Sequence, residues 1–347
     1  MIIRTSAMGD IVHCLPVLSA LRRSLPEARI AWVVEKTFEP ILAGHPDIDQ
    51  LIPVRLRAWR KNLFSAPVRH EMRTAYRAMR QFAPDVALDL MGNHKGGLLA
   101  RLSGARRTLG AARPFRREAS SALWINEPIA APRTHAVDRA LDVLAGLQPE
   151  VRGTTADFAG DKLLAQVPVE AQQFLAQRPR PFVVIQAGAG WGNKTYPAPW
   201  WGEVAQRLRE QATVDTVVPI APGEEHLAAA VVDASAGAAV AVDAKAFTFL
   251  AAVLRASRLL LGGDTGPLHL AHALGTPVLC LIGPTDPARN GPYQAPEQVI
   301  WKRLPCSNCY KRFAEPRACL LNIPPREVAA RALAVLQPTA PPLAHRV

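Results

Sequence analysis

Hydrophobic and polar positions divide the chain into two kinds of block. Short apolar runs rich in β-branched residues, typical of buried strands, alternate with longer stretches whose apolar residues recur at helical spacing. In the first half this pattern predicts strands at 1–5, 30–34, 51–54 and 85–90, and helices at 16–24, 69–82, 95–103 and 135–147. In the second half it predicts strands at 182–186, 216–220, 240–242, 259–262 and 278–282, and helices at 200–211, 225–235, 248–257, 268–274 and 326–336.

The repeated alternation of strands and helices predicts an α/β fold with parallel sheets covered on both faces. The pattern weakens at residues 148–181, which contain several prolines and glycines and which we interpret as an interdomain linker. We therefore expect two Rossmann-like, doubly wound domains, at 1–165 and 175–322, that face a central cleft. A C-terminal helix and tail at 323–347 are expected to pack back toward the N-terminal domain. Ligands of such sheets bind at the carboxyl ends of the strands.

Composition narrows the class of protein. Of 347 residues, 49% are hydrophobic and 20% are charged, which is typical of globular proteins. No apolar run approaches the ~18 residues that a membrane span needs, and the N-terminus has no evident secretory signal. Five cysteines are too few for a disulfide framework in a chain of this length, which favours a reducing compartment.

The chain is basic, with 41 lysines and arginines against 29 acidic residues and a net charge of +12. This balance favours acidic partners: nucleic acid, an anionic membrane face or a phosphorylated substrate. No helix-turn-helix, zinc-finger or RNP pattern supports the first, so we expect no nucleic-acid partner. Residues 55–80 hold much of the charge, and Glu71 is the only acidic residue that opposes it. Trp59 lies among the cations of this run. This run is either a solvated basic face or an anion-binding surface.

Asp10 is the first candidate for chemistry, in a small polar loop at residues 5–11 that follows the first predicted strand. A carboxylate at the carboxyl end of a strand can act as a general base and take a proton from an acceptor hydroxyl. The alternative is that Asp10 only caps or structures the loop, as aspartates in such positions commonly do.

A second candidate is the run at residues 262–269, where an apolar strand ends in two glycines and a helix opens near Pro267. Free N–H groups and the positive end of the dipole at a helix N-terminus bind phosphate. Asp264 beside a phosphate is unfavourable, so it is expected to accept from a sugar hydroxyl or to hold the loop. The alternative is helix capping by Asp264 or Thr265.

Two further motifs are less specific. The glycine-rich loop at 188–194 ends in Lys194 and has the composition of a diphosphate cradle, although its spacing is not that of a Walker A motif. Cys306, Cys309 and Cys319 supply three potential metal ligands, one fewer than a structural zinc site needs. We therefore assign no metal site.

Taken in order, the motifs resemble those of the bacterial ADP-heptose:lipopolysaccharide heptosyltransferases, inverting GT-B glycosyltransferases. Residues 2–13 look like the N-terminal signature of that family, and 264–269 and 283–287 match it in the second domain. Residues 57–67, residues 89–92 with Lys95, and residues 135–139 resemble heptosyltransferase I in particular. The resemblance covers nearly the whole chain.

The resemblance implies transfer of heptose from ADP-heptose to the Kdo residue of an inner-core lipid A acceptor during lipopolysaccharide biosynthesis. It also implies that no metal or other cofactor is required. Asp10 then matches the general base. The donor-binding positions are Lys194 at the diphosphate, Glu224 or its neighbour Glu225 at the ribose, Lys245 near the adenine, and the run Asp264, Thr265, Gly266 and His269. The basic positions that engage the acidic acceptor are Arg57, Arg60, Lys61 and Arg117.

The expected cellular setting is the cytoplasm, with peripheral contact to the cytoplasmic face of the inner membrane, and we expect a monomer. An alternative stays open. The cysteine pattern looks more like that of heptosyltransferase II, and the glycine loop replaces a threonine-rich donor loop found in some members. A heptosyltransferase II-like enzyme, or another sugar-nucleotide transferase of the family with a different donor or acceptor, is the second interpretation.

Overall fold

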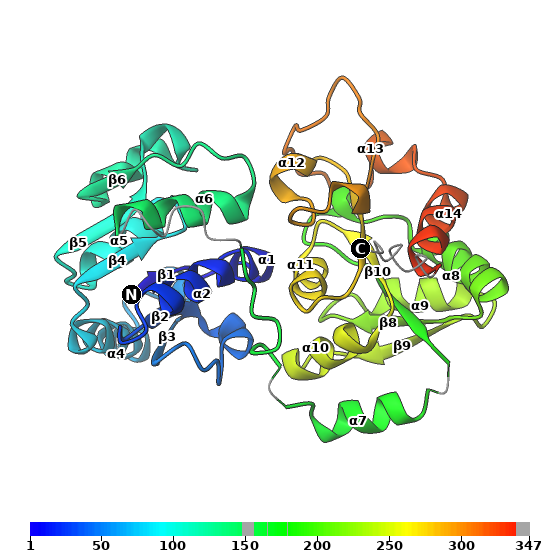
Figure 1. The fold of residues 1–347 in the computed structure, drawn as a ribbon, viewed down its shortest axis with the longest axis horizontal. Helices are drawn as coiled ribbons and strands as arrows, with labels where there is room; N and C mark the ends of the chain where they lie inside the picture. Colours follow the sequence, from blue (N-terminus) through cyan, green and yellow to red (C-terminus); the bar gives the residue numbers. More distant parts are fainter. Residues whose placement is uncertain (148–155, 165, 179, 338–347) are drawn as a thin grey trace, which may run out of the picture. The chain divides into compact units, whose positions relative to one another are not determined.

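The computed structural model describes residues 1–147, 156–164, 166–178 and 180–337 (Figure 1). These form two compact units, Met1–Ala165 and Gln166–Val347, and each unit is considered by itself. Both units are α/β, as the alternating pattern predicted.

The first unit contains one parallel sheet of six strands in the order β3-β2-β1-β4-β5-β6. The strands are β1 (Ile2–Ile3), β2 (Ala31–Glu35), β3 (Gln50–Val54), β4 (Val86–Asp89), β5 (Arg107–Ala111) and β6 (Glu127–Ile129). The α-helices are α1 (Met8–Val12), α2 (Leu15–Ser24), α3 (Leu56–Lys61), α4 (Ala66–Phe82), α5 (His94–Leu102) and α6 (Ala136–Asp142). Short 3-10 helices are η1 (Lys36–Ile41), η2 (Arg113–Phe115), η3 (Ala119–Trp124) and η4 (Val143–Gly146).

The second unit repeats this plan with the strand order β12-β11-β10-β7-β8-β9, again all parallel. The strands are β7 (Phe182–Gln186), β8 (Asp215–Ile220), β9 (Ala239–Asp243), β10 (Leu260–Gly263), β11 (Val278–Ile282) and β12 (Val299–Trp301). The longer helices are α7 (Val169–Ala176), α8 (Ala198–Ala212), α9 (Glu225–Ala234), α10 (Phe247–Ala256), α11 (Gly266–Ala273) and α14 (Pro325–Leu336). The shorter ones are η6 (Gly192–Lys194), α12 (Pro287–Asn290), η7 (Pro296–Gln298) and α13 (Ala318–Leu321).

In each sheet the early strands of the unit lie on one side of its first strand and the later strands lie on the other side, which is the doubly wound arrangement. In the first unit the strand order reverses between β1 and β4, and in the second between β7 and β10. The two loops on either side of such a reversal separate and leave a crevice at the carboxyl ends of the strands. The topology therefore singles out the segments after β1, β4, β7 and β10.

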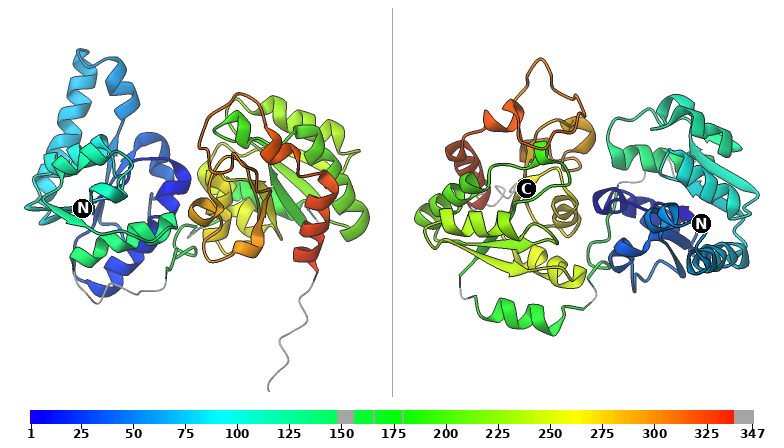
Figure 2. Two further views of the ribbon diagram at one scale, coloured as in Figure 1. Left: turned by 90° about the horizontal axis from the view of Figure 1, so that it is seen from above. Right: turned by 180° about the vertical axis from the view of Figure 1, so that it is seen from behind.

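Burial of apolar residues explains why the elements form where they do. All five residues of β7 and of β11 are buried, as expected for central strands of a covered parallel sheet. In the second unit Val183 and Ile185 pack in one core with Trp201 of α8. In the first unit α4 contributes Ala75 and Met79 to the core against the sheet. Figure 2 shows the helices around each sheet from two further directions.

The structure differs from the predicted pattern in several segments. Residues 5–11 were expected to be a loop, but α1 begins at Met8. The predicted linker contains helix α7, and its residues 148–155 lie outside the described residues. Helix α14 belongs to the second unit, where Val328 and Ala332 join the core with α8. The expected packing of the C-terminal helix toward the N-terminal domain stays a prediction. Residues 338–347 of the predicted tail lie outside the described residues.

Candidate functional site

The switch point of the second unit brings Lys194 and Asp264 together. Lys194 ends η6 after β7, and Asp264 directly follows β10, so both lie at the carboxyl ends of neighbouring strands. The Lys194 ammonium lies 2.6 Å from Oδ2 of Asp264 and donates more weakly to its backbone carbonyl at 3.4 Å. The two side chains are only 13% and 7% exposed. The sequence named both residues, and the topology explains why they meet.

Asp264 is the centre of this cluster. Nε2 of His269 lies 3.0 Å from Oδ1, and the Thr285 hydroxyl donates to Oδ2 at 2.9 Å. Burial alone would raise the pKa of Asp264, but the hydrogen bond from His269 and the charge of Lys194 outweigh burial and hold this pKa below its ordinary value. Since both oxygens are engaged, Asp264 holds the loop and the lysine in place. Of its two predicted roles, the structure favours loop-holding.

Helix α11 begins immediately after this carboxylate. Its N-cap is Thr265, whose side chain makes no capping hydrogen bond, and Pro267 lies in the first turn. The Oγ1 atom of Thr265 is buried and has no hydrogen-bond partner among the described residues. Capping by Asp264 or Thr265, the alternative interpretation, is therefore not found. The N–H groups at this helix start, including that of Gly266, remain available in the way that phosphate binding needs.

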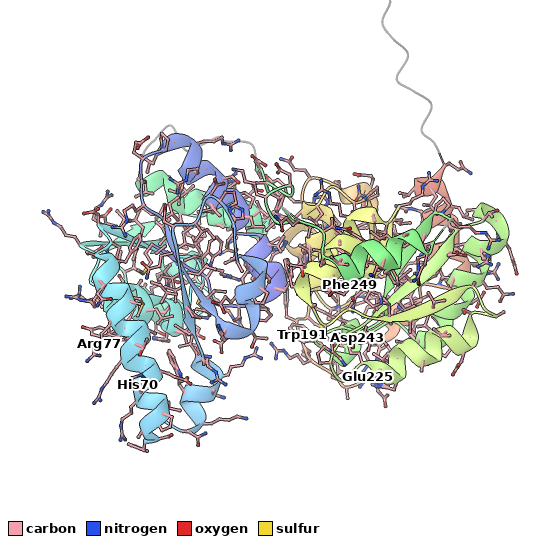
Figure 3. The ribbon with its side chains drawn as sticks, turned by 90° about the horizontal axis from the view of Figure 1, so that it is seen from below. His70, Arg77, Trp191, Glu225, Asp243 and Phe249 are labelled. Atoms are coloured by element: carbon pink, nitrogen blue, oxygen red, sulfur yellow. The ribbon has the colours of Figure 1, made fainter. Side chains whose placement is uncertain are left out.

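The glycine-rich loop lies beside this cluster. A Cβ atom on Gly188 would overlap the carboxyl group of Glu224, and one on Gly192 would overlap the backbone carbonyl of Ala314. Gly190 has nothing within 4 Å of its Cβ position. The ring of Trp191, labelled in Figure 3, carries two cations, with Lys194 Nζ and Arg312 Cζ each 4.5 Å from its centroid.

Two more predicted donor residues follow the next strands of the same sheet. Glu224 precedes α9 after β8 and accepts a long hydrogen bond of 3.5 Å from Gln186. Burial raises the pKa of Glu224 above its ordinary value and outweighs the lowering effect of His226, while Glu225 adds a smaller raising effect. Lys245 follows β9 and is exposed, 3.4 Å from Asp243 and 3.9 Å from Glu225. The sequence thus placed its donor candidates at successive strand ends of one sheet.

In the first unit, the switch point carries Asp10. This residue lies in the first turn of α1, where Oδ2 accepts a weak hydrogen bond from the backbone N–H of Ala7 at 3.3 Å. Its other oxygen pairs with the guanidinium of Arg4 at 2.6 Å. The Asp10 side chain is 47% exposed whereas Arg4 is 14% exposed, so the arginine orients a carboxylate that solvent can reach. The sequence analysis did not single out Arg4, although this residue directly follows β1, the strand that precedes Asp10.

The loop after β4 is held by a second, fully buried ion pair. Asp89 pairs with Arg116, both side chains being 0% exposed, and also accepts from the backbone N–H of Met91 at 3.0 Å. Gly92 adopts a φ of +62°, and its Cβ position lies 3.4 Å from the backbone nitrogen of Arg117. This pair fixes the segment that presents the exposed Arg117.

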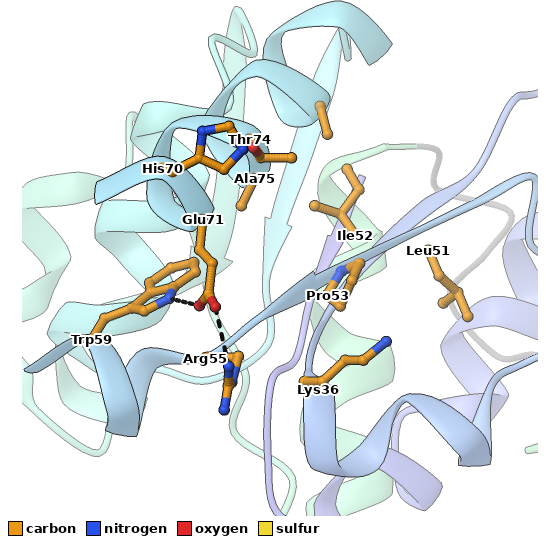
Figure 4. Close-up of a pocket in the computed structure, with 11 residues that line it drawn as sticks. Lys36, Leu51, Ile52, Pro53, Arg55, Trp59, His70, Glu71, Thr74 and Ala75 are labelled. Carbon is orange, nitrogen blue, oxygen red and sulfur yellow. Dashed lines mark hydrogen bonds and ion pairs between the residues drawn. The ribbon is translucent and has the colours of Figure 1, made fainter. Parts of the chain in front are cut away.

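The other basic candidates lie on α3, where Arg57, Arg60 and Lys61 are all exposed. Behind them is a cavity of about 340 Å³ between β3, α3 and α4. Its wall includes Trp59, whose indole N–H donates to Glu71 at 2.9 Å (Figure 4). Glu71 also pairs with Arg55 at 3.1 Å. Glu71, the single acidic residue of the basic run, is therefore already bound to Trp59 and Arg55.

The remaining cysteine motif does not assemble a metal site among the residues that the structure describes. No group of three or more histidine, cysteine or acidic side chains there has the geometry to hold a metal ion. Cys306, Cys309 and Cys319 are free thiols.

Two doubly wound parallel units, each with polar side chains at its switch point, are the architecture of the GT-B fold. The sequence profile described as glycosyltransferase family 9 (heptosyltransferase) matches residues 72–317. The chain belongs to this family.

Individual relatives agree with this assignment. Over 315 residues the chain is 29% identical to lipopolysaccharide heptosyltransferase 1 of Pseudomonas aeruginosa, an alignment that covers 90% of this chain and 86% of that protein. Among solved structures it is similar to E. coli heptosyltransferase WaaC with ADP, with a TM-score of 0.78, 27% identity, and coverage of 96% and 98%. WaaC with ADP-2-deoxy-2-fluoro heptose gives a TM-score of 0.77, 26% identity and the same coverage.

Among the described residues, no helix combines the length and apolarity needed to cross a membrane.

Proposed function

We propose that this chain transfers heptose, with inversion, from ADP-heptose to the Kdo residue of an inner-core lipid A acceptor in lipopolysaccharide biosynthesis. The observation that carries the proposal is the cluster of Lys194 and Asp264 at the β7/β10 switch point, directly before the uncapped start of α11. A buried cation next to free helix N–H groups suits a nucleoside diphosphate. The two related WaaC structures, one with ADP and one with an ADP-heptose analogue, support this choice of donor.

The donor is proposed to lie along the strand ends of the second unit. Lys194 and the N–H groups at Thr265 and Gly266 would meet the diphosphate and offset the charge that develops on the departing ADP. His269 would act through Asp264, which it helps to hold in place. Glu224 would accept from the ribose hydroxyls, and Lys245 would lie near the adenine. Lys194 and the helix start supply the positive charge, so the proposed reaction requires no metal.

Asp10 is proposed to act as the general base. In the transfer step an acceptor hydroxyl gives its proton to the Asp10 carboxylate as its oxygen attacks the anomeric carbon. The new carbon–oxygen bond forms while the bond between the anomeric carbon and the phosphate oxygen breaks, which inverts the anomeric centre. Arg4 keeps the carboxylate oriented through its 2.6 Å contact. Arg57, Arg60, Lys61 and Arg117 would engage the acidic groups of the acceptor.

The proposed setting is the cytoplasm, where the chain acts as a monomer in peripheral contact with the cytoplasmic face of the inner membrane. The net charge of +12 favours attachment to an anionic surface. We propose no nucleic-acid partner. The second candidate is a heptosyltransferase II-like enzyme, motivated by the pattern of Cys306, Cys309 and Cys319, or another sugar-nucleotide transferase of the family, motivated by the glycine loop at 188–192.

The direct test is single-turnover transfer from ADP-heptose to Kdo-containing lipid A without divalent metal, followed by mass spectrometry of the lipid. One added heptose is the expected result. No addition to this lipid, together with addition to a lipid that already carries one heptose, would select the second candidate. A panel of ADP-, GDP- and UDP-sugars checks the donor, and a preference for a uridine donor would refute the proposal.

The role of Asp10 is tested separately with Asp10→Ala. General-base catalysis contributes about 10²–10⁴-fold, so transfer should fall by at least about 100-fold while ADP affinity stays near wild type. Turnover close to wild type in this variant would remove Asp10 from the mechanism.

A further inference from the structure

The turn between α3 and α4 exposes large apolar side chains. Phe64 is 91% exposed and Leu63 is 48% exposed, and both lie in the connection between Lys61, the last residue of α3, and Ala66, the first of α4. We call residues 62–65 the hairpin tip. A phenyl ring that is almost fully solvated in a well-packed domain is unfavourable unless another surface covers it.

The hairpin tip is an ordered turn. The backbone N–H of Ser65 donates to the carbonyl of Asn62 at 3.0 Å, and that of Arg69 donates to the carbonyl of Ser65 at 2.9 Å. The Arg69 guanidinium also donates to the carbonyl of Phe64. These bonds hold Leu63 and Phe64 outward at the middle of the turn. Their exposure therefore follows from the local hydrogen bonding.

The charge around the hairpin tip has one sign. Cationic side chains are exposed on α3 and along the outer side of α4, where Figure 3 labels Arg77. The exposed lysines and arginines of α3 and α4 are Arg57, Arg60, Lys61, Arg69, Arg73, Arg77 and Arg80. The one acid of the hairpin, Glu71, is already bound to Trp59 and Arg55. The surface is thus an apolar point surrounded by uncompensated positive charge.

We propose that the hairpin tip docks on the surface of an anionic lipid bilayer. Phe64 and Leu63 enter the boundary between headgroups and acyl chains, and the surrounding cations contact the lipid phosphates. Helix α4 does not lie flat in the membrane as an amphipathic helix would, because Ala75, Met79 and Phe82 are already buried in the core of its own unit. Met72 and Tyr76 of α4 are partly exposed, but the most exposed apolar side chain of the hairpin is Phe64 at its tip.

Charge complementarity selects this partner over a second copy of the chain. A two-fold interface through the hairpin would place the same cations opposite each other, which repels. An anionic bilayer meets both needs at once, since it neutralises the cations and covers the phenyl ring. The inference rests on the proposed function, because membrane docking would bring the chain to a lipid A acceptor that is embedded in a bilayer. Vesicle binding can nevertheless be measured without any turnover.

The test is co-sedimentation of the full chain with large vesicles that contain no lipid A. Vesicles with about 30% phosphatidylglycerol are compared with neutral phosphatidylcholine vesicles. We expect binding to the anionic vesicles only, weakened as salt rises from about 0.05 M to about 0.5 M. The double variant Leu63→Ser/Phe64→Ser should bind on the order of tenfold more weakly. The matched control is Leu123→Ser, which removes another leucine of the same unit that is 67% exposed and should leave binding unchanged.

Folding and function are checked in the same series. Since Phe64 is nearly fully exposed, the double variant should keep the wild-type Tm. It should also keep wild-type turnover on a soluble, deacylated acceptor and lose turnover only on acceptor in vesicles. Phe64→Trp keeps an aromatic ring, so it should bind normally and add tryptophan emission that brominated lipids quench. Equal vesicle binding by wild type and double variant, or equal binding to neutral vesicles, would overturn the inference, whereas absent heptose transfer would overturn only the proposed function.

Discussion

Lys194→Met is the variant that separates a binding role from a structural role at the switch point. Methionine keeps much of the apolar stem and removes the ammonium that lies 2.6 Å from Asp264. If Lys194 contacts the diphosphate, one charge-assisted hydrogen bond is lost, worth roughly 1.5–3 kcal/mol. That corresponds to an ADP affinity about 10- to 150-fold weaker.

The same change also removes half of a buried ion pair. Breaking such a pair typically costs about 3–5 kcal/mol, because the remaining charge stays buried without its partner. Asp264 keeps its contacts to His269 and Thr285, so we expect the lower end of that range, about 3 kcal/mol. For a domain of this size the Tm should fall by about 6–12 °C.

Calorimetric ADP titration and a thermal melt measure the two effects independently. The matched control is Lys302→Met in the same unit, which breaks a pair to Glu327 of similar length, 2.8 Å, whose side chains are 37% and 33% exposed. Such surface pairs contribute about 0–1 kcal/mol, so the control should leave ADP affinity unchanged and the Tm nearly so. A lowered Tm with wild-type ADP affinity in Lys194→Met would refute the binding role and leave the lysine as a structural partner of Asp264.

Three further outcomes are expected. Gly192→Ala should lower the Tm, because the added Cβ would overlap the backbone carbonyl of Ala314. A thermal melt followed by circular dichroism measures this, and a wild-type Tm would contradict that packing. The folded-state pKa of Asp264 is below the 3.8 of its ordinary value, so the unfolded chain binds more protons near that pH, and the stability this group contributes is present above about pH 4 and lost as pH falls below it. In urea unfolding, Asp264→Asn should flatten that acid-side loss, and an unchanged slope would argue against it. Burial raises the pKa of Cys14 to about 12, so at pH 8 a maleimide should modify the exposed Cys306 and spare Cys14, as peptide mapping by mass spectrometry would show.

The fold could be predicted from the sequence where strands are central and apolar. The predicted strands 182–186 and 278–282 coincide with β7 and β11 because each is an apolar run, broken only by Gln186 at the end of β7, and every residue of both strands is buried. The missed strands β5, β6 and β12 lie toward or at the sheet edges. β6 is only three residues long and contains Pro128, which a sheet tolerates at an edge. Their pairing comes from neighbouring strands, which a local pattern does not contain.

The candidate site was predictable residue by residue but not as an arrangement. The loops after strands pointed to Asp10, Lys194 and Asp264, since ligands of parallel sheets bind there. Thr285 reaches Asp264 because β11 lies next to β10 in the sheet. The order of the strands cannot be predicted from any single segment of the sequence. In the same way, the Asp89–Arg116 pair joins residues on separate elements, and only the folded chain shows that both are fully buried.

The glycine-rich loop shows how one sequence motif can combine unrelated constraints. Taken as a motif, three glycines before Lys194 predict a phosphate cradle. In the structure Gly188 leaves space for the carboxyl group of Glu224, and Gly192 leaves space for the backbone of Ala314. Packing therefore explains why both positions are glycine. Only Gly190 has an open Cβ position, which makes it the one glycine of this loop where a ligand is able to approach the backbone closely. The loop's share of donor binding should therefore depend on Gly190, and its share of domain stability on Gly192.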